Sequence, residues 1–278
     1  NTTGTSNTVI GQQAGYTNST GVENTFVGRV AGYYVTGSYN TGIGFASLGV
    51  NSSGASGQYN TAIGHSALNY NTTASNNTAV GYQAGYSNTT GTNNSFFGGS
   101  ADGSAGYNNT TGNRNSFIGV GAGYFNTTGS DNVAVGKNAY AANTTTATGN
   151  YNTAIGNSSL FNNTTASGNT ALGYVAGYNI TTGYENIAIG SNANYSNTTG
   201  HDNVIVGTAA LYYQSGSYNV AVGNAALQGT GGSYTGGIAN VAIGDHALFS
   251  NTTASYNTAV GYQSLYVHTT QLWVYRHF

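Results

Sequence analysis

Apolar and polar residues follow one another in the same order many times along this chain. The segment that begins at Asn77 reads Asn-Thr-Ala-Val-Gly-Tyr-Gln-Ala-Gly-Tyr-Ser-Asn-Thr-Thr-Gly, and related segments fill almost the whole sequence. With this first Asn as position one, fifteen units begin at Asn7, Asn24, Asn40, Asn60, Asn77, Asn94, Asn115, Asn132, Asn152, Asn169, Asn186, Asn203, Asn219, Asn240 and Asn257. Most units are 17 residues long. Because a unit this short cannot bury a core by itself, the period indicates stacked coils.

Three fixed positions in each unit predict a short β-strand followed by a bend. The fourth residue is always apolar, the fifth is always Gly and the eighth is always Ala or Ser, as in Val80, Gly81 and Ala84. We expect the strand to end at the Gly, with the fourth side chain directed inward and the eighth in a narrow core. The abundance of Gly, Asn and Thr makes a helix unfavourable.

The second half of the unit predicts a second strand edge and a closing turn. Aromatic residues are frequent at position ten, as in Leu160-Phe161 and Gly177-Tyr178, and we expect them to form a ladder. The unit closes through Asn-Thr-Thr-Gly or Asn-Thr-Thr-Ala, where Asn and Thr bond local backbone and Gly supplies a positive φ. The opening Asn residues are expected to stack as a ladder of amides, with ligand binding as the alternative role.

These features predict an all-β protein, a parallel β-solenoid (β-roll) of about fifteen coils that spans residues 1–266. Longer units, such as those that begin at Asn40 and Asn94, are expected to carry their extra residues as loops after position eight. Residues 267–278 depart from the repeat and are interpreted as a C-terminal cap or a subunit-joining segment. The candidate assembly residues in this segment are Leu272, Trp273, Tyr275 and Phe278.

The repeat also carries a resemblance to known fibrous proteins. The segments Asn60 to Ala67 and Asn152 to Ser159 resemble the head repeats of YadA-like trimeric autotransporter adhesins. The segments Asn77 to Ala84 and Asn257 to Ser264 are similar to repeats of phage tail-fibre proteins. The resemblance implies a left-handed parallel β-roll in a trimeric rod. This repeat is longer than that of the adhesins, so a single-chain solenoid stays open as an alternative.

Composition narrows the classes of function. Only 4% of the residues are charged and the net charge is −2, which argues against a nucleic-acid partner or an anionic membrane surface. The chain has no Cys, and no apolar run approaches the length of a membrane span. We therefore expect neither disulfides nor membrane insertion. The sequence begins inside a unit, which is expected for a processed or truncated amino terminus.

Candidate chemistry is sparse. His65, His201, His246, His268 and His277 are scattered, and the neighbours in Asp245-His246 and His201-Asp202 are expected to face opposite ways along a strand. Several charges precede the opening Asn, namely Glu23, Arg114, Asp131, Glu185 and Asp202. Arg114 and Asp131 are expected to pair, whereas Glu185 and Asp202 provide too few oxygens for Ca²⁺. We predict no catalytic residues, no metal site, no cofactor and no enzyme activity.

One column of Asn residues forms glycosylation sequons. It occupies position twelve at Asn18, Asn51, Asn71, Asn88, Asn126, Asn143, Asn163, Asn197 and Asn251. On a glycosylating secretory route this column would carry a row of surface glycans. The favoured interpretation is a turn-forming Asn with Thr beside it. The Thr array also suggests an ice-binding face, although the column is interrupted at Val35, Ala105, Ile180, Gln214 and Thr230.

We therefore expect a structural subunit of an extracellular or virion fibre with an adhesive role. Its location would be extracellular, on a cell surface or on a virion. Its partners would be further copies of itself, as a homotrimer or a head-to-tail filament, and cell-surface carbohydrate contacted through many weak sites. A phage tail-fibre shaft and an ice-binding solenoid are the alternatives.

Overall fold

The structure, a computed structural model, describes residues 3–49, 54–142, 146–230, 236–267 and 275–277. The chain divides into two compact units. Unit 1 comprises Asn1–Asn138 with Thr145–Thr148, and unit 2 comprises Ala139–Thr144 with Gly149–Phe278. Every regular element among the described residues is a β-strand, which confirms the prediction of an all-β parallel solenoid with a repeat near 17 residues.

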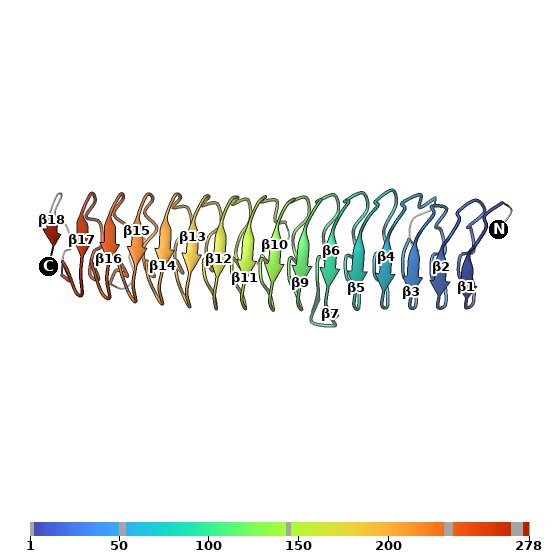
Figure 1. Cartoon of the computed structure of the whole chain (residues 1–278), viewed down its shortest axis with the longest axis horizontal. Helices are drawn as coiled ribbons and strands as arrows, with labels where there is room; N and C mark the ends of the chain where they lie inside the picture. The colour runs from blue at the N-terminus through green and yellow to red at the C-terminus, as the bar shows by residue number, and fades with distance from the viewer. Residues whose placement is uncertain (1–2, 50–53, 143–145, 231–235, 268–274, 278) are drawn as a thin grey trace. The chain divides into compact units, whose positions relative to one another are not determined.

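Unit 1 is a stack of coils that each contribute one short strand to a parallel sheet (Figure 1). Neighbouring strands pair in register, so that Thr61 lies opposite Thr78 and Ala62 lies opposite Ala79. The strands are β1 (Thr8–Ile10), β2 (Thr25–Val27), β3 (Thr41–Ile43), β4 (Thr61–Ile63), β5 (Thr78–Val80), β6 (Ser95–Phe97), β9 (Ser116–Ile118) and β10 (Val133–Val135). A separate antiparallel hairpin is formed by β7 (Gly99–Ser100) and β8 (Gly103–Ser104).

Unit 2 repeats the same arrangement. Its strands are β11 (Thr153–Ile155), β12 (Thr170–Leu172), β13 (Ile187–Ile189), β14 (Val204–Val206), β15 (Val220–Val222), β16 (Val241–Ile243), β17 (Thr258–Val260) and β18 (Tyr275–His277). They pair in parallel in chain order, and Tyr275 of β18 lies opposite Thr258 of β17. Leu272, Trp273 and Phe278 lie outside the described residues, so the role of the carboxyl-terminal segment stays a prediction.

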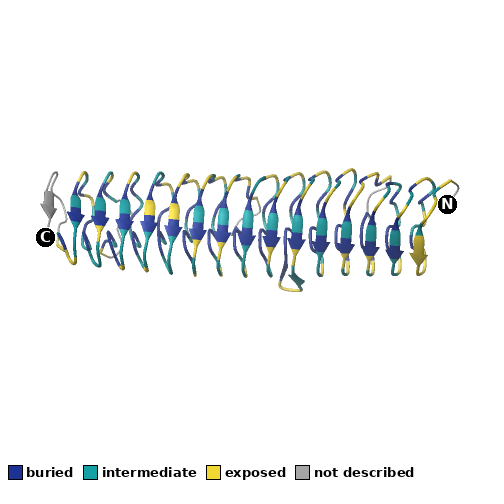
Figure 2. Ribbon diagram, viewed as in Figure 1, coloured by how far each residue is buried: buried dark blue, intermediate teal, exposed yellow. Residues whose placement is uncertain are grey.

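From β2 to β6 and from β9 to β17, the side chain that each strand buries is the third residue of the repeat, whereas β1 at the end of the stack buries none (Figure 2). Ala62 and Phe117 are fully buried at this position, whereas Ile63 and Ile118 at the fourth position are 38% and 44% exposed. The prediction that the fourth residue points inward is therefore wrong. The opening Asn is buried in almost every described coil, and strand side chains alternate, so the third residue shares its face and the fourth faces outward.

The bend after the strand follows the prediction, but the closing turn does not. Gly81 has a φ of 132°, a region that residues with a Cβ rarely adopt. In the closing turn, by contrast, Gly91 has no positive φ, and the left-handed residue is Asn93, with a φ of 58°. Gly91 is required by space instead, because a Cβ there would lie 2.3 Å from the carbonyl oxygen of Gly112.

In several coils the residues at positions three and nine differ in size in opposite directions. Where position three is Phe, a Gly packs against the ring: a Cβ on Gly123 would lie 2.3 Å from the Phe117 ring, and Gly106, which follows the hairpin, takes this place beside Phe96. Where position three is small, position nine is often a buried Leu, as in Ala154 and Leu160. The expected second strand edge is absent from the described residues at positions nine and ten, which form turns. Leu160 there adopts a left-handed φ of 47°.

The longer repeat that begins at Asn94 places its extra residues in an unexpected part of the coil. The hairpin of β7 and β8 follows β6 directly, and the buried small residue that follows is Ala105 rather than Ala101, which is exposed. The prediction of a loop after position eight is therefore wrong for this unit. The segment Gly-Gly-Ser-Ala-Asp-Gly-Ser-Ala contains two Ala residues, and the sequence pattern selected the wrong one.

Candidate functional site

The opening Asn residues form the predicted amide ladder inside each unit. In unit 2, the Asn186 Oδ1 accepts hydrogen bonds from the Asn203 backbone N at 3.2 Å and from the Asn203 Nδ2 at 2.8 Å. The Asn186 Nδ2 donates to the Gly200 carbonyl at 2.9 Å. In unit 1, the Asn77 backbone N donates to the Asn60 Oδ1 at 3.1 Å. Because these amides are buried and satisfied by the next coil, their role is structural.

The sequon column lies inside the coils rather than on the surface. Asn88 and Asn197 are fully buried; the Asn88 Nδ2 donates to the Gly91 carbonyl at 2.9 Å, and the Asn197 Oδ1 accepts from the Gly200 N at 2.7 Å. The favoured interpretation of a turn-forming Asn fits the described members, because their buried amides close the turn, and the alternative of surface glycans does not fit them. These members are Asn18, Asn71, Asn88, Asn126, Asn163, Asn197 and Asn251; Asn51 and Asn143 lie outside the described residues.

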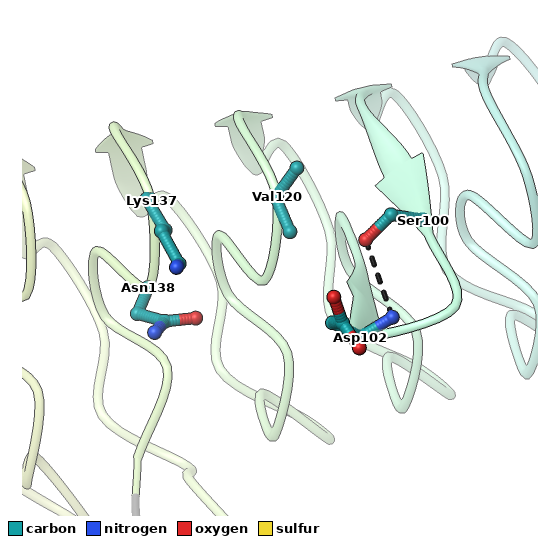
Figure 3. Close-up of a pocket in the computed structure, with 5 residues that line it drawn as sticks. All are labelled: Ser100, Asp102, Val120, Lys137 and Asn138. Atoms are coloured by element: carbon teal, nitrogen blue, oxygen red, sulfur yellow. Dashed lines mark hydrogen bonds between the residues drawn. The ribbon is translucent and has the colours of Figure 1, made fainter.

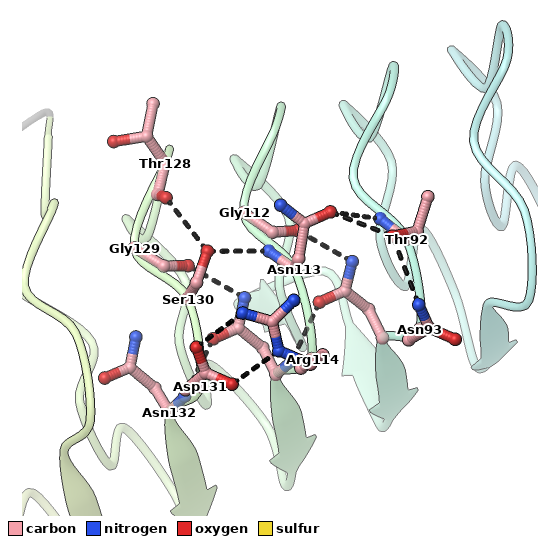
Figure 4. A network of polar contacts seen from close by, with 12 residues as sticks. Thr92, Asn93, Gly112, Asn113, Arg114, Thr128, Gly129, Ser130, Asp131 and Asn132 are labelled. Carbon is pink, nitrogen blue, oxygen red and sulfur yellow. Dashed lines mark hydrogen bonds and ion pairs between the residues drawn. The ribbon is translucent and has the colours of Figure 1, made fainter.

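The charged column contains the predicted ion pair (Figure 4). The Arg114 Nε donates to the Asp131 Oδ1 at 2.6 Å, and an Arg114 terminal nitrogen donates to the other carboxylate oxygen at 2.8 Å. This hydrogen bond holds the pKa of Asp131 below its usual range. The Arg114 side chain is 59% exposed, so the pair contributes little to stability. The Ser130 hydroxyl accepts from the Asn113 N at 3.0 Å, which ties the same coils together.

The two adjacent His–Asp pairs meet, contrary to prediction. The His201 Nδ1 and the Asp202 Oδ2 are 2.7 Å apart, and His246 contacts Asp245 in the same way. The strand argument fails because Asp202 and His246 have left-handed φ values of 56° and 57°, which places each pair in a turn.

Among the described residues, no three His, Cys, Asp or Glu side chains gather as ligands for a metal ion. Glu185 and Asp202, the two carboxylates weighed for Ca²⁺, are therefore not part of such a group among the described residues. His268 lies outside the described residues, and only the backbone of His277 is described.

The predicted aromatic ladder runs along position ten of the coils. Tyr86, Tyr107 and Tyr124 stack in unit 1 with ring centroids 5.0 and 5.2 Å apart. In unit 2, the ring pairs Phe161–Tyr178, Tyr178–Tyr195 and Tyr195–Tyr212 stack at 5.2, 5.2 and 4.8 Å. These distances follow the spacing of paired strands, roughly 4.8 Å. Burial, and then a hydrogen bond with Tyr70, raise the pKa of Tyr86 to about 12.

A second aromatic row, not identified from the sequence, lies at position six of the repeats in unit 1. The Arg29 guanidinium lies 5.4 Å from the Phe45 ring centre, Phe45 lies 4.9 Å from His65, and His65 lies 5.2 Å from Tyr82. Phe45 and Tyr82 are 41% and 39% exposed. The common position directly after the bend glycine was the signal in the sequence. This row presents flat rings and one cation to solvent.

The outward face of the sheet has a different composition in the two units. In unit 1, β2 to β5 present Thr at the first strand position. In unit 2, β13 to β16 present Ile or Val at both outward positions. We call this group the aliphatic face. Its residues are half-buried or exposed, and they are Ile187, Ile189, Val204, Val206, Val220, Val222, Val241 and Ile243.

Unit 1 also contains an open pocket beside the β7–β8 hairpin (Figure 3). Its volume is about 440 Å³, and it is lined by Ser100, Asp102, Val120, Lys137 and Asn138. The Ser100 hydroxyl accepts a hydrogen bond from the Asp102 N at 3.2 Å, which shapes the hairpin turn. The sequence indicated the insertion through its 21-residue spacing, but it did not place these side chains together.

Comparison with protein-family models, with curated proteins and with solved structures found no match. The described part of the chain has no helix with the length and hydropathy to cross a membrane.

Proposed function

We propose that this chain is a structural subunit of an extracellular or virion fibre. Its coils form a scaffold that associates with further copies through the aliphatic face of unit 2. The observation that carries the proposal is the sequence of β13 to β16, where every outward strand residue is Ile or Val. Contiguous apolar surface on a soluble protein marks an interaction site, because burying it removes the area from water.

A second copy of the chain is the occupant that fits this face best. The aliphatic face carries no charged side chain, so it offers no electrostatic partner for a basic or acidic protein. Its residues repeat at the spacing of paired strands, and a second copy presents the same spacing. The resemblance to adhesin head repeats supports a trimer, and the departure in repeat length leaves other assembly numbers open.

An adhesive role is supported by the two aromatic rows. Tyr, Phe and His rings at regular spacing offer many equivalent contacts to a carbohydrate surface. Each contact would be weak, and assembly of several chains would multiply them into a stable attachment. Copies of the chain would thus associate through the aliphatic face. The aromatic row at position six and the exposed edges of the aromatic ladder at position ten would contact the carbohydrate surface.

Sedimentation of the purified chain over a range of concentrations tests the proposal. We expect a defined oligomer of the unaltered chain, and a monomer for the double variant Val204→Thr with Val220→Thr, which gives unit 2 the outward residue of unit 1. The matched control is Val133→Thr on β10, which should leave the mass unchanged. A monomeric unaltered chain, or a double variant that still assembles, would refute self-association through this face.

Ice binding is a second candidate, supported by one observation. Thr25, Thr41, Thr61 and Thr78 lie in register on the outward face of β2 to β5 and form a row of hydroxyl and methyl groups. A thermal-hysteresis assay decides it. Hysteresis that is lost in the double variant Thr41→Lys with Thr61→Lys would support this role, and no hysteresis in the unaltered chain would remove it.

A further inference from the structure

Three departures from the repeat coincide at the pocket beside the β7–β8 hairpin. The hairpin provides Ser100 and Asp102 from an insertion after β6. The next coil has Gly121 at position seven, where the other repeats carry a side chain, such as Gln83 or Ser158. The coil after that provides Lys137, the only lysine of the chain. The pocket is therefore built by the exceptions in an otherwise regular stack.

Gly121 makes room for the floor of the pocket. A Cβ at this position would lie 2.3 Å from the Asn138 Oδ1. The missing side chain lets the Asn138 amide lie across the preceding coil and face the pocket (Figure 3). An amide offers two N–H donors and a carbonyl acceptor, and Val120 adds an apolar surface beside it.

Two opposite charges line the pocket without neutralising each other. Only 4% of the residues are charged, yet Asp102 and Lys137 come from different coils to the same pocket. No ion pair joins either group to another charge within the described residues. Figure 3 shows Asp102 and Lys137 on opposite sides of the pocket, with Val120 between them and Asn138 on the side of Lys137. The carboxylate disfavours a polyanion and the ammonium disfavours a metal cation.

We infer that this pocket binds an acidic sugar residue of the hexuronic acid type. This inference rests on the proposed adhesive function and names the class of receptor. The sugar carboxylate pairs with the Lys137 ammonium, ring hydroxyls donate to the Asp102 carboxylate, and the Asn138 amide bonds a further hydroxyl. The C–H face of the ring packs on Val120. The pocket volume of about 440 Å³ accommodates one or two sugar residues.

Titrations with glucuronate, glucose and glucosamine, followed by nuclear magnetic resonance, test this inference. We expect glucuronate to bind about tenfold more tightly than glucose, and Lys137→Gln to abolish that preference. Asp102→Asn should weaken both sugars, and Gly121→Ala should weaken both by displacing Asn138. Arg114→Gln is the matched control, because it removes a surface cation that does not line the pocket and should leave binding unchanged.

The titrations are made in the Val204→Thr and Val220→Thr background, so that binding is measured independently of self-association. A site that binds glucuronate in this background supports the inference whatever the native mass proves to be. Equal affinity for the three sugars, a preference for glucosamine, no binding, or unchanged glucuronate affinity in Lys137→Gln would each overturn it.

Discussion

The two units have the same coil backbone but different residues inside and outside it. Unit 1 fills three of its coils with Phe at position three and a Gly packed against the ring, as in Phe117 and Gly123. Unit 2 has no Phe at position three, and Leu is frequent at position nine. At the first strand position, which faces outward, Thr and Ser predominate on unit 1, whereas β13 to β16 of unit 2 present Ile and Val there.

This comparison separates what the coil requires from what it tolerates. Inside, Phe with Gly and Ala with Leu are two ways to fill the same part of a coil, which is the behaviour of a close-packed core. Outside, the strands pair in the same register whether the outward residue is Thr or Val. The outward positions are therefore the ones that can differ for functional reasons.

The largest effect on the free energy of unfolding is expected when the residue pair that fills the core of one unit is replaced by the pair that fills the other. Phe117→Ala in unit 1 should lower the free energy of unfolding by about 3–5 kcal/mol, because it leaves a cavity beside Gly123. Adding Gly123→Leu should restore part of the loss, since Leu160 already tolerates the same left-handed backbone with a φ of 47°. Urea denaturation midpoints, followed by tyrosine fluorescence, provide the measurement.

The matched test in unit 2 runs in the opposite direction. Ala154→Phe should destabilise the coil by overpacking, by about 1–3 kcal/mol, and Leu160→Gly in the same chain should recover part of it. If the second substitution fails to rescue the first in both units, positions three and nine do not share volume, and the comparison of cores is incorrect.

A smaller effect, of opposite sign, is expected at Asn194. This residue occupies position nine of its repeat in unit 2 and is fully buried, and neither of its side-chain polar atoms has a hydrogen-bond partner among the residues that the structure describes. The next coil has Leu211 at the same position. Asn194→Leu should raise the free energy of unfolding by about 1 kcal/mol, because it removes an unsatisfied buried amide. Asn186→Leu, which removes a satisfied amide, serves as the contrasting control and should destabilise the protein.

The smallest effect concerns alkaline pH and the aromatic ladder. The pKa of Tyr86 is raised from 10.0 to about 12, so the folded chain holds its proton more tightly than the unfolded chain. This contribution is present below pH 10 and is lost as the pH rises towards 12. A pH titration followed by phenolate absorbance should show one fewer tyrosine that ionises near pH 12 in Tyr86→Phe. An unchanged titration curve in that variant would contradict the shift.

The sequence predicted the features that depend on the repeat period alone. Fifteen opening Asn residues at a period near 17 indicated parallel coils with an amide ladder, and aromatic residues at position ten indicated a stack of rings. Each of these follows when identical residues are placed one strand spacing apart.

The orientation of the strand side chains, the burial of the sequon column and the pocket could not be predicted from the repeat period alone. Hydrophobicity alone put the fourth residue inside, but the buried Asn ladder fixes the alternation and turns that residue outward. The sequon column allowed two interpretations, surface glycans and a turn-forming Asn, and the hydrogen bonds of Asn88 and Asn197 favour the turn. The pocket residues Asp102 and Lys137 are 35 positions apart in the sequence, and only stacking of the coils brings them together.

Thiol labelling of single cysteines tests most directly the proposal that chains associate through the aliphatic face. The chain has no Cys of its own, so each introduced thiol is the single site of labelling. Thr61→Cys and Val204→Cys place one thiol on the outward face of each unit. We predict similar labelling rates in dilute solution and selective protection of the thiol at position 204 as concentration increases. Equal labelling of both thiols at every concentration would show that the aliphatic face is not an interface.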